Sequence, residues 1–327
     1  MKLAILDSGI DRMHPYLKDN VLGGCSVIGE KTDYGDDNGH GTLCASVIKK
    51  EAPHVRIWAV KVLNENNEAT LEKLKAALEA LKRTPVRLIY MSLSVTEKCD
   101  VREISRLLRE MAEDGRIFVC SLMNGRRESF PAVLREVIGV RGSILESEDT
   151  FWYDSDREVQ CVMDFNPYLH ACPGGYRLFG KNNSFAAAKL TGRIAALLEA
   201  DPQLTKEGLE RKLAGLAKRT RWEEKDLAAS LRFPEKTKRP VPENIRKRTE
   251  DAVKEFLEIP RTESLEGKIL FWKSVGLTDR NCFALIQRLE ENFGFRAGDY
   301  TDISRYDLCF IENLAAVITR MMEDEWK

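Results

Sequence analysis

The sequence lacks long hydrophobic runs and any excess of one charge sign. No stretch approaches the roughly 18 apolar residues that a membrane-spanning helix needs, although 43% of the 327 residues are hydrophobic. Lysine and arginine number 51 and aspartate and glutamate 52, for a net charge of −1. No global field therefore favours nucleic acid or an anionic membrane as a partner. These absences exclude both classes of partner and leave a globular chain of about two domains.

Paired cysteine motifs and a secretory leader are also missing. The eight cysteines are scattered without a CxxC pair, at positions 25, 44, 99, 120, 161, 172, 282 and 309. Residues 1–6 indicate a short buried strand, because their apolar run is too short for the hydrophobic region of a signal peptide. We therefore expect reduced, mostly buried thiols and a cytoplasmic protein.

A serine in front of small residues is the most informative feature that is present. Ser184 precedes Phe185 and three alanines, and the apolar residues that follow recur at helical spacing. This pattern predicts a helix over 184–199 with Ser184 at its N-terminus. Free N–H groups and the positive end of the helix dipole stabilise negative charge there. Ser184 is therefore either a nucleophile or an ordinary N-cap on a buried helix.

Three earlier segments hold further candidate residues. Asp7 ends an apolar run over residues 2–7, which is typical of a strand covered on both faces. His40 lies in Gly-His-Gly-Thr, where the glycines allow close backbone approach. Cys44 follows one helical turn later, either as a thiol beneath a site or as a packed small hydrophobe. Asn124 precedes a glycine. Alone, each has an ordinary interpretation: a surface aspartate, a structural histidine and a turn asparagine.

In chain order these motifs resemble the subtilisin-like serine proteases across residues 1–218. That family carries its catalytic residues in the order Asp, His, Ser, with an asparagine between the histidine and the serine. The resemblance implies a triad of Asp7, His40 and Ser184, with Asn124 as the side-chain donor to the oxyanion. It also implies a peptide or protein substrate.

Alternating strand and helix patterns predict an α/β fold with a parallel sheet and helices on both faces. The expected strands cover 2–7, 55–63, 86–93, 116–122, 136–142 and 159–163, and the expected helices include 68–82, 100–114, 184–199 and 204–217. Many family members carry a longer calcium-binding loop before the strand at 55–63. Its absence here predicts that this calcium site is missing, and we expect no metal or other cofactor.

Several positions depart from the family pattern. The usual Gly-Thr before the serine is Asn182-Asn183, and the usual proline four residues after it is Ala188. The substrate-binding strand reads Ser92-Leu93-Ser94, with Ser94 in place of glycine, and Met123 replaces a small residue before Asn124. We expect Ser94 and Met123 to narrow the P1 pocket and to favour small P1 residues.

The C-terminal part differs in character. Residues 219–244 combine prolines with basic residues and predict a linker. Residues 245–327 resemble an acyl or peptidyl carrier domain, a four-helix bundle, on the Leu-Glu-Glu-x-Phe-Gly and Ile-Glu-Asn-Leu motifs. Asp279 occupies the position of the phosphopantetheine serine, so we expect a docking fold without phosphopantetheine. A generic helical bundle is the alternative.

The combined hypothesis is an intracellular serine endopeptidase of narrow specificity. It would mature a dedicated peptide or protein, such as a ribosomally made modified peptide, and its carrier-like domain would dock that substrate or a peptide-modifying partner protein. Two alternatives stay open: a catalytically silent pseudo-protease that grips a peptide, and a general housekeeping protease.

Overall fold

The computed structural model describes residues 1–95, 100–229 and 233–324, and the chain divides into two compact units. The first unit comprises Met1–Phe165, Ala171–Gly174 and Gly180–Arg232. The second comprises Asn166–His170, Gly175–Phe179 and Phe233–Lys327.

The first unit is built on an eight-stranded sheet of order β2-β3-β1-β4-β5-β6-β8-β7. Neighbouring strands are parallel, except that β7 runs antiparallel to β8 at one edge. Every residue of β4 and β5 is buried, as expected for strands covered on both faces. The predicted α/β fold with a mostly parallel sheet is confirmed. The strands are β1 (Lys2–Asp7), β2 (Val21–Ser26), β3 (Arg56–Lys61), β4 (Leu88–Met91), β5 (Ile117–Ser121), β6 (Val137–Ser143), β7 (Phe151–Tyr153) and β8 (Cys161–Asp164).

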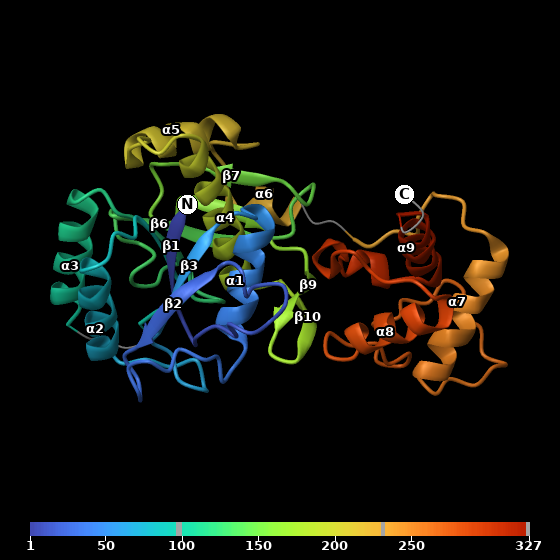
Figure 1. Cartoon of the computed structure of the whole chain (residues 1–327). Coiled ribbons are helices and arrows are strands. Elements are labelled where there is room, and N and C mark those ends of the chain that lie inside the picture. The colour runs from blue at the N-terminus through green and yellow to red at the C-terminus, as the bar shows by residue number, and fades with distance from the viewer. Residues whose placement is uncertain (96–99, 230–232, 325–327) are drawn as a thin grey trace. The chain divides into compact units, whose positions relative to one another are not determined.

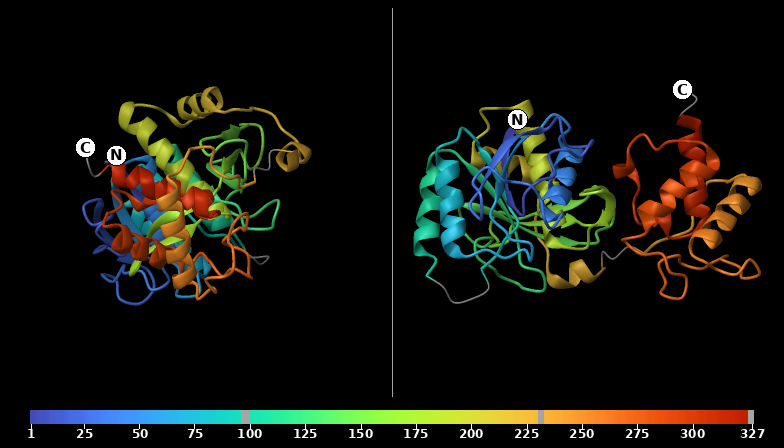
Figure 2. Two further views of the ribbon diagram at one scale, coloured as in Figure 1. Left: turned by 90° about the vertical axis from the view of Figure 1, so that its right-hand side faces the viewer. Right: turned by 60° about the horizontal axis from the view of Figure 1, so that its bottom comes forward.

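Helices cover both faces of this sheet. On one face α2 (Leu71–Lys82) packs beside α3 (Arg102–Glu113), and on the other α1 (His40–Glu51) packs beside α4 (Asn183–Ala200) (Figure 1). The two further views in Figure 2 show the same layers. The apolar faces of α2 and α3 bury Leu74, Leu78 and Leu108 against the sheet. Two more helices, α5 (Lys206–Leu216) and α6 (Glu224–Ala229), follow α4.

The contact between α1 and α4 depends on a glycine. A Cβ on Gly192 would lie 2.6 Å from the Cβ of Glu51 and 2.8 Å from the carbonyl oxygen of Ile48. Both distances are shorter than real Cβ contacts, so only glycine lets the two helix backbones approach this closely. Gly192 thus sets how closely α4 packs against α1.

The strands β2 and β7 were not anticipated from the sequence. β2 is only partly buried and contains two glycines, and β7 has three residues. Such edge strands carry weak local signals, because hydrogen bonds to a neighbouring strand hold them in place.

The stretch 219–244, expected as a linker, is partly folded. Trp222 is buried and packs against Trp152 with ring centroids 5.9 Å apart. The Tyr153 N–H donates to the Arg219 carbonyl over 3.0 Å. A single large aromatic residue anchors this segment, which its basic and proline-rich composition obscures.

The second unit is mainly helical. It contains α7 (Glu243–Phe256), α8 (Cys282–Phe293) and α9 (Ile311–Asp324), with the 3₁₀ helices η1 (Tyr300–Asp302) and η2 (Tyr306–Leu308) between α8 and α9. α8 ends at Gly294, whose φ of 72° is the left-handed conformation that favours glycine at a helix C-terminus. Four α-helices were expected, and three are present in the described part of this region. No described helix in the chain is long and apolar enough to cross a membrane.

A hairpin contributes to the second unit's core. Its strands are β9 (Tyr168–Cys172) and β10 (Gly175–Phe179). Leu169 and Leu178 are buried in the same cluster as residues of α7, α8 and α9. The Leu169 N–H donates to the Ile303 carbonyl over 2.9 Å. The rings of Tyr176, Phe283 and Tyr300 pack in tilted and edge-to-face pairs with centroids 4.7–5.3 Å apart. The hairpin and the C-terminal helices therefore share one core.

Candidate active site

An aspartate and a histidine meet at the carboxyl edge of the sheet. Asp7 is the last residue of β1 and is 1% exposed, and His40 is the first residue of α1. The Nδ1 atom of His40 lies 2.7 Å from Oδ1 of Asp7. The same carboxylate oxygen accepts the Ser8 N–H over 2.7 Å. The short contact fixes the orientation of the ring. It places a proton on Nδ1, which donates it in a hydrogen bond to the carboxylate, and Nε2 is therefore the basic nitrogen.

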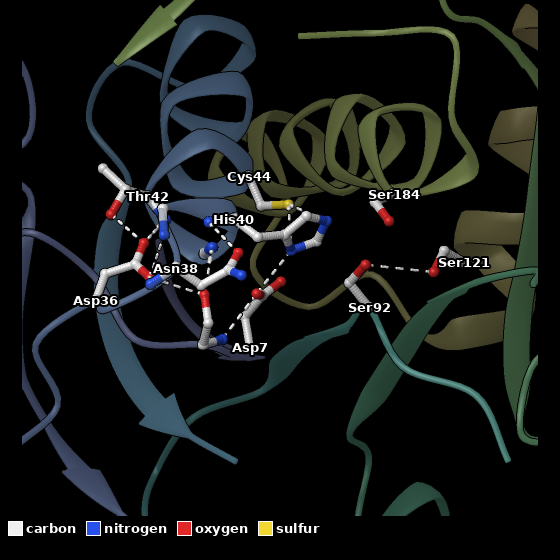
Figure 3. A network of polar contacts seen from close by, with 12 residues as sticks. Asp7, Asp36, Asn38, His40, Thr42, Cys44, Ser92, Ser121 and Ser184 are labelled. Carbon is white, nitrogen blue, oxygen red and sulfur yellow. Dashed lines mark hydrogen bonds and ion pairs between the residues drawn. The ribbon is translucent and has the colours of Figure 1, made fainter. Parts of the chain in front are cut away.

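Asp36 holds the segments that carry this pair. Its Oδ1 accepts the Ser8 hydroxyl over 2.8 Å and the Gly39 N–H over 2.7 Å. Its Oδ2 accepts the N–H of Thr42, in the first turn of α1, over 2.9 Å (Figure 3). A carboxylate at a helix N-terminus satisfies free N–H groups and complements the dipole. Asp36 thereby ties α1 to the residue that follows Asp7.

Close backbone approach completes this contact. A Cβ on Gly41 would lie 2.0 Å from the Gly9 carbonyl oxygen and 3.2 Å from the Cβ of Asp7. The glycine after His40 therefore permits the first turn of α1 to reach β1, as its place in the Gly-His-Gly-Thr motif indicates.

Ser184 lies across the imidazole from Asp7. It is partly exposed in the first turn of α4, and its side chain lies on the far side of the His40 ring in Figure 3. The Tyr90 hydroxyl lies 3.0 Å from the Ser184 carbonyl oxygen and 3.2 Å from the sulfur of Cys44. The Cys44 sulfur lies 3.8 Å from Nδ1 of His40. Tyr90 and Cys44 thus link the first turn of α1 to the first turn of α4.

Two of the backbone N–H groups at the start of α4 have side-chain acceptors, and the one between them does not among the described residues. The Asn183 N–H donates to Oδ1 of Asn124 over 2.9 Å, and the Phe185 N–H donates to Oδ1 of Asn182 over 2.8 Å. The Ser184 N–H has no acceptor in the part of the chain that the structure describes. Because the amide oxygen of Asn124 is already bonded, its Nδ2 group is left as a donor. An anion beside Ser184 would find two donors here.

The candidate substrate-binding residues follow two adjacent strands. Ser92, Leu93 and Ser94 come directly after β4, and Met123 comes two residues after β5. β4 and β5 are parallel neighbours, so these residues lie at the same edge of the sheet as Asp7. The Ser92 and Ser121 hydroxyl oxygens lie 3.4 Å apart, and the Met123 N–H donates to the Ser129 hydroxyl over 2.9 Å.

Electrostatics make His40 a strong base. Burial by itself lowers the pKa of His40. The charge and hydrogen bond of the Asp7 carboxylate, together with the Cys44 sulfur beside the ring, outweigh burial and raise that pKa well above 6.5. Burial raises the pKa of the Cys44 thiol. Cys44 therefore stays a neutral thiol near pH 7, and Asp7 supplies the charge that faces the imidazole.

Asp7, His40 and Cys44 are also the candidate metal ligands among the described residues, with ligand atoms that lie within 4.8 Å of one another. A metal would need the Cys44 thiolate, which burial disfavours, and it would compete for the imidazole that Asp7 already holds. The donor set therefore does not favour a resident metal. None of the seven cysteines in the described residues forms a disulfide, and Cys99 lies outside those residues.

The structure brings Asp7, His40 and Ser184 together and places Asn124 beside the start of α4. Asp36 and Tyr90 also belong to the site, although the sequence motifs do not single them out. Asp36 carries a local signal, because an aspartate just before a predicted helix indicates an N-terminus. Tyr90 carries none, since its neighbours in a buried strand are equally apolar.

Known proteins are similar to this chain in sequence and in fold. The profile of the subtilase family (Peptidase S8) matches residues 1–233. The chain is 28% identical over 237 residues to the major intracellular serine protease of Bacillus subtilis (strain 168), covering 65% of this chain and 72% of that protein. It is 27% identical over 246 residues to an intracellular serine protease of Paenibacillus polymyxa, covering 67% and 74%.

A solved structure supports the same assignment at the level of the fold. A cold-adapted subtilisin-like serine proteinase superimposes with a TM-score of 0.56 at 19% identity, covering 65% of this chain and 81% of that chain. Because the family match spans residues 1–233, this chain belongs to the subtilase family and is a serine endopeptidase.

Proposed function

We propose that the chain cleaves peptide bonds with Asp7, His40 and Ser184 as its catalytic residues. One observation carries the proposal. A buried carboxylate lies 2.7 Å from Nδ1 of a histidine whose opposite side faces a serine at a helix N-terminus. A general base held by an orienting group and directed at a hydroxyl is the arrangement that activates a nucleophile.

The reaction follows from these positions. The Ser184 hydroxyl oxygen attacks the peptide carbonyl while Nε2 of His40 takes its proton. Asp7 stabilises the resulting imidazolium, and His40 then protonates the leaving amine. Water then attacks the acyl carbonyl while Nε2 of His40 takes its proton. His40 returns that proton to the Ser184 oxygen as the acyl group leaves. The raised pKa of His40 makes the imidazole a stronger base for the first proton transfer.

The oxyanion binds at the start of α4. Its two donors are the Ser184 N–H and Nδ2 of Asn124, which remain available after the neighbouring N–H groups have been bonded. A donor of this kind is worth on the order of 100- to 1,000-fold in rate, a value established on subtilisin itself.

Narrow specificity is the second part of the proposal. Ser94 and Met123 stand where the family carries smaller residues, at the ends of neighbouring strands. The hydrogen bond from Met123 to Ser129 restrains one of these two segments. We expect a preference for small P1 residues. Equal cleavage after Phe and after Ala in a P1 peptide library would contradict it.

The biological role is the third part. Both relatives above are named as intracellular serine proteases, which supports a cytoplasmic enzyme. Its substrate is a dedicated peptide or protein, such as a ribosomally made modified peptide. The helical C-terminal region, carrier-like but with Asp279 in place of serine, docks this substrate or a peptide-modifying partner protein. Cleavage of one peptide encoded nearby, with casein left intact, is the expected result. Rapid casein hydrolysis would favour a housekeeping protease.

Covalent labelling tests the catalytic assignment. Intact mass after fluorophosphonate treatment should show one adduct on the wild-type chain and none on Ser184→Ala. The adduct requires a serine that a base has activated. Folded wild-type protein without an adduct would contradict the proposal and favour the peptide-binding pseudo-protease.

A further inference from the structure

Asn183 joins three segments around the nucleophile. Its side-chain oxygen accepts the Gly142 N–H over 2.8 Å, and its side-chain nitrogen donates to the Leu122 carbonyl over 2.8 Å. Its own N–H donates to Oδ1 of Asn124 over 2.9 Å. Asn183 is only 8% exposed, so these bonds form away from bulk solvent.

One side-chain partner lies close to Asn124 along the chain, and the other belongs to the strand beside β5. Leu122 follows β5 and is two residues before Asn124, and Gly142 belongs to the neighbouring strand β6. An asparagine side chain offers one acceptor and one donor on adjacent atoms, and both are used here. Asn183 thereby bonds to the Leu122 carbonyl and to the Gly142 N–H through two different atoms, whereas the threonine usual in the family offers a single, closer-set oxygen.

The orientation of the Asn124 amide follows from this arrangement. With Asn183 bonded to two strands, its N–H is held against the Asn124 oxygen, and the amide cannot rotate without losing that bond. Nδ2 of Asn124 is then directed away from Asn183. We propose that Asn183 is a positioning residue that orients the Asn124 amide toward the oxyanion. This inference rests on the proposed triad and oxyanion site.

A double-mutant cycle tests the inference on the full chain. The second-order rate constant for fluorophosphonate labelling is measured for wild type, Asn183→Ala, Asn124→Ala and the double variant. All are assayed below the onset of thermal unfolding. We expect Asn183→Ala to slow labelling at least tenfold. The double variant should be at least fivefold faster than the product of the two single effects predicts, because Asn183 acts through Asn124. Strict multiplication of the two effects would overturn the proposal.

Two further variants separate positioning from folding. Asn183→Thr introduces the family's usual residue, which keeps one of the two side-chain bonds, and should label at an intermediate rate. Asn182→Gly removes the other side-chain bond to α4, the one that does not involve Asn124. Its effect should multiply with that of Asn124→Ala. Coupling of Asn182 to Asn124 as strong as that of Asn183 would overturn the proposal. An unlabelled wild type would instead refute the proposed function.

Discussion

Asp7 contributes most to the basicity of His40, and Cys44 adds a further contribution. Burial alone lowers the pKa of its imidazole, and the Asp7 carboxylate at 2.7 Å reverses that effect. The site therefore depends on a charge that is buried with the base and is held by the Ser8 N–H.

The pH profile of labelling should report this pair. Only neutral His40 accepts the serine proton, so the rate should rise with pH through a midpoint above 6.5. In Asp7→Asn the attraction disappears while burial remains, so the midpoint should move to lower pH. The maximal rate should fall on the order of 10⁴-fold, as for the same substitution in the established triad of a serine protease. Fluorophosphonate labelling from pH 5 to pH 10 measures both quantities, and an unmoved midpoint would contradict this account.

Asn182 and Asn183 show why departures from a family pattern need structural interpretation. In the sequence, their replacement of the family's usual Gly-Thr suggests an altered active site. In the structure Asn182 caps α4 through the Phe185 N–H, and Asn183 bonds to two strands. The hydrogen bonds of these two side chains hold the start of α4 in place, and they are therefore compatible with a Ser184 that is fixed in position.

At the scale of the elements, two helix N-termini bring the catalytic groups together. α1 begins at His40, and Ser184 lies in the first turn of α4. Side chains from loops accept some of the free N–H groups of both helices: Asp36 on α1, and Asn182 and Asn124 on α4. The distance between base and nucleophile therefore depends on how closely α1 and α4 pack.

Gly192→Ala should disturb that packing. The new methyl group would meet the Ile48 carbonyl oxygen at 2.8 Å, so the helices must separate. We expect a loss of about 1–3 kcal/mol in the free energy of unfolding, as for other overpacked sites. Slower fluorophosphonate labelling should accompany it. Urea denaturation measures the first effect.

Gly215→Ala is the matched control. It is the same substitution inside α5, at a position where nothing lies within 4 Å of the added Cβ. Alanine should stabilise the helix by about 0.5–1 kcal/mol. If both variants changed stability in the same direction, the close contact of α1 and α4 would not be the cause.

At the scale of the whole molecule, the second unit includes a hairpin from the family-matched part of the chain. Residues 166–170 and 175–179 lie within the matched range 1–233, yet they share a core with the C-terminal helices. β10 ends at Phe179, and the chain then leads directly to Ser184. The C-terminal region therefore stabilises a segment of the protease sequence as well as itself.

Leu178→Ser tests the shared core. Leu178 is 5% exposed, and its loss should destabilise the second unit by about 2–5 kcal/mol. Leu216→Ser is the control, because Leu216 is 60% exposed and should change stability by less than about 0.5 kcal/mol. Hydrogen exchange of α8 amides measures the effect. Equal protection of α8 in both variants would show that the hairpin does not contribute to this core.

The sequence alone determined the α/β class, the chain order of Asp7, His40 and Ser184, and the helix that follows the serine. Local periodicity and motif order suffice for these, because they depend on residues close in the chain. Tertiary structure decided the strand order, the roles of Asp36, Tyr90 and Asn183, and the membership of the hairpin. These depend on contacts between distant segments, such as Ser8 with Asp36 and Leu169 with Ile303. No local pattern encodes such contacts, since many polar or apolar residues fit the same periodicity.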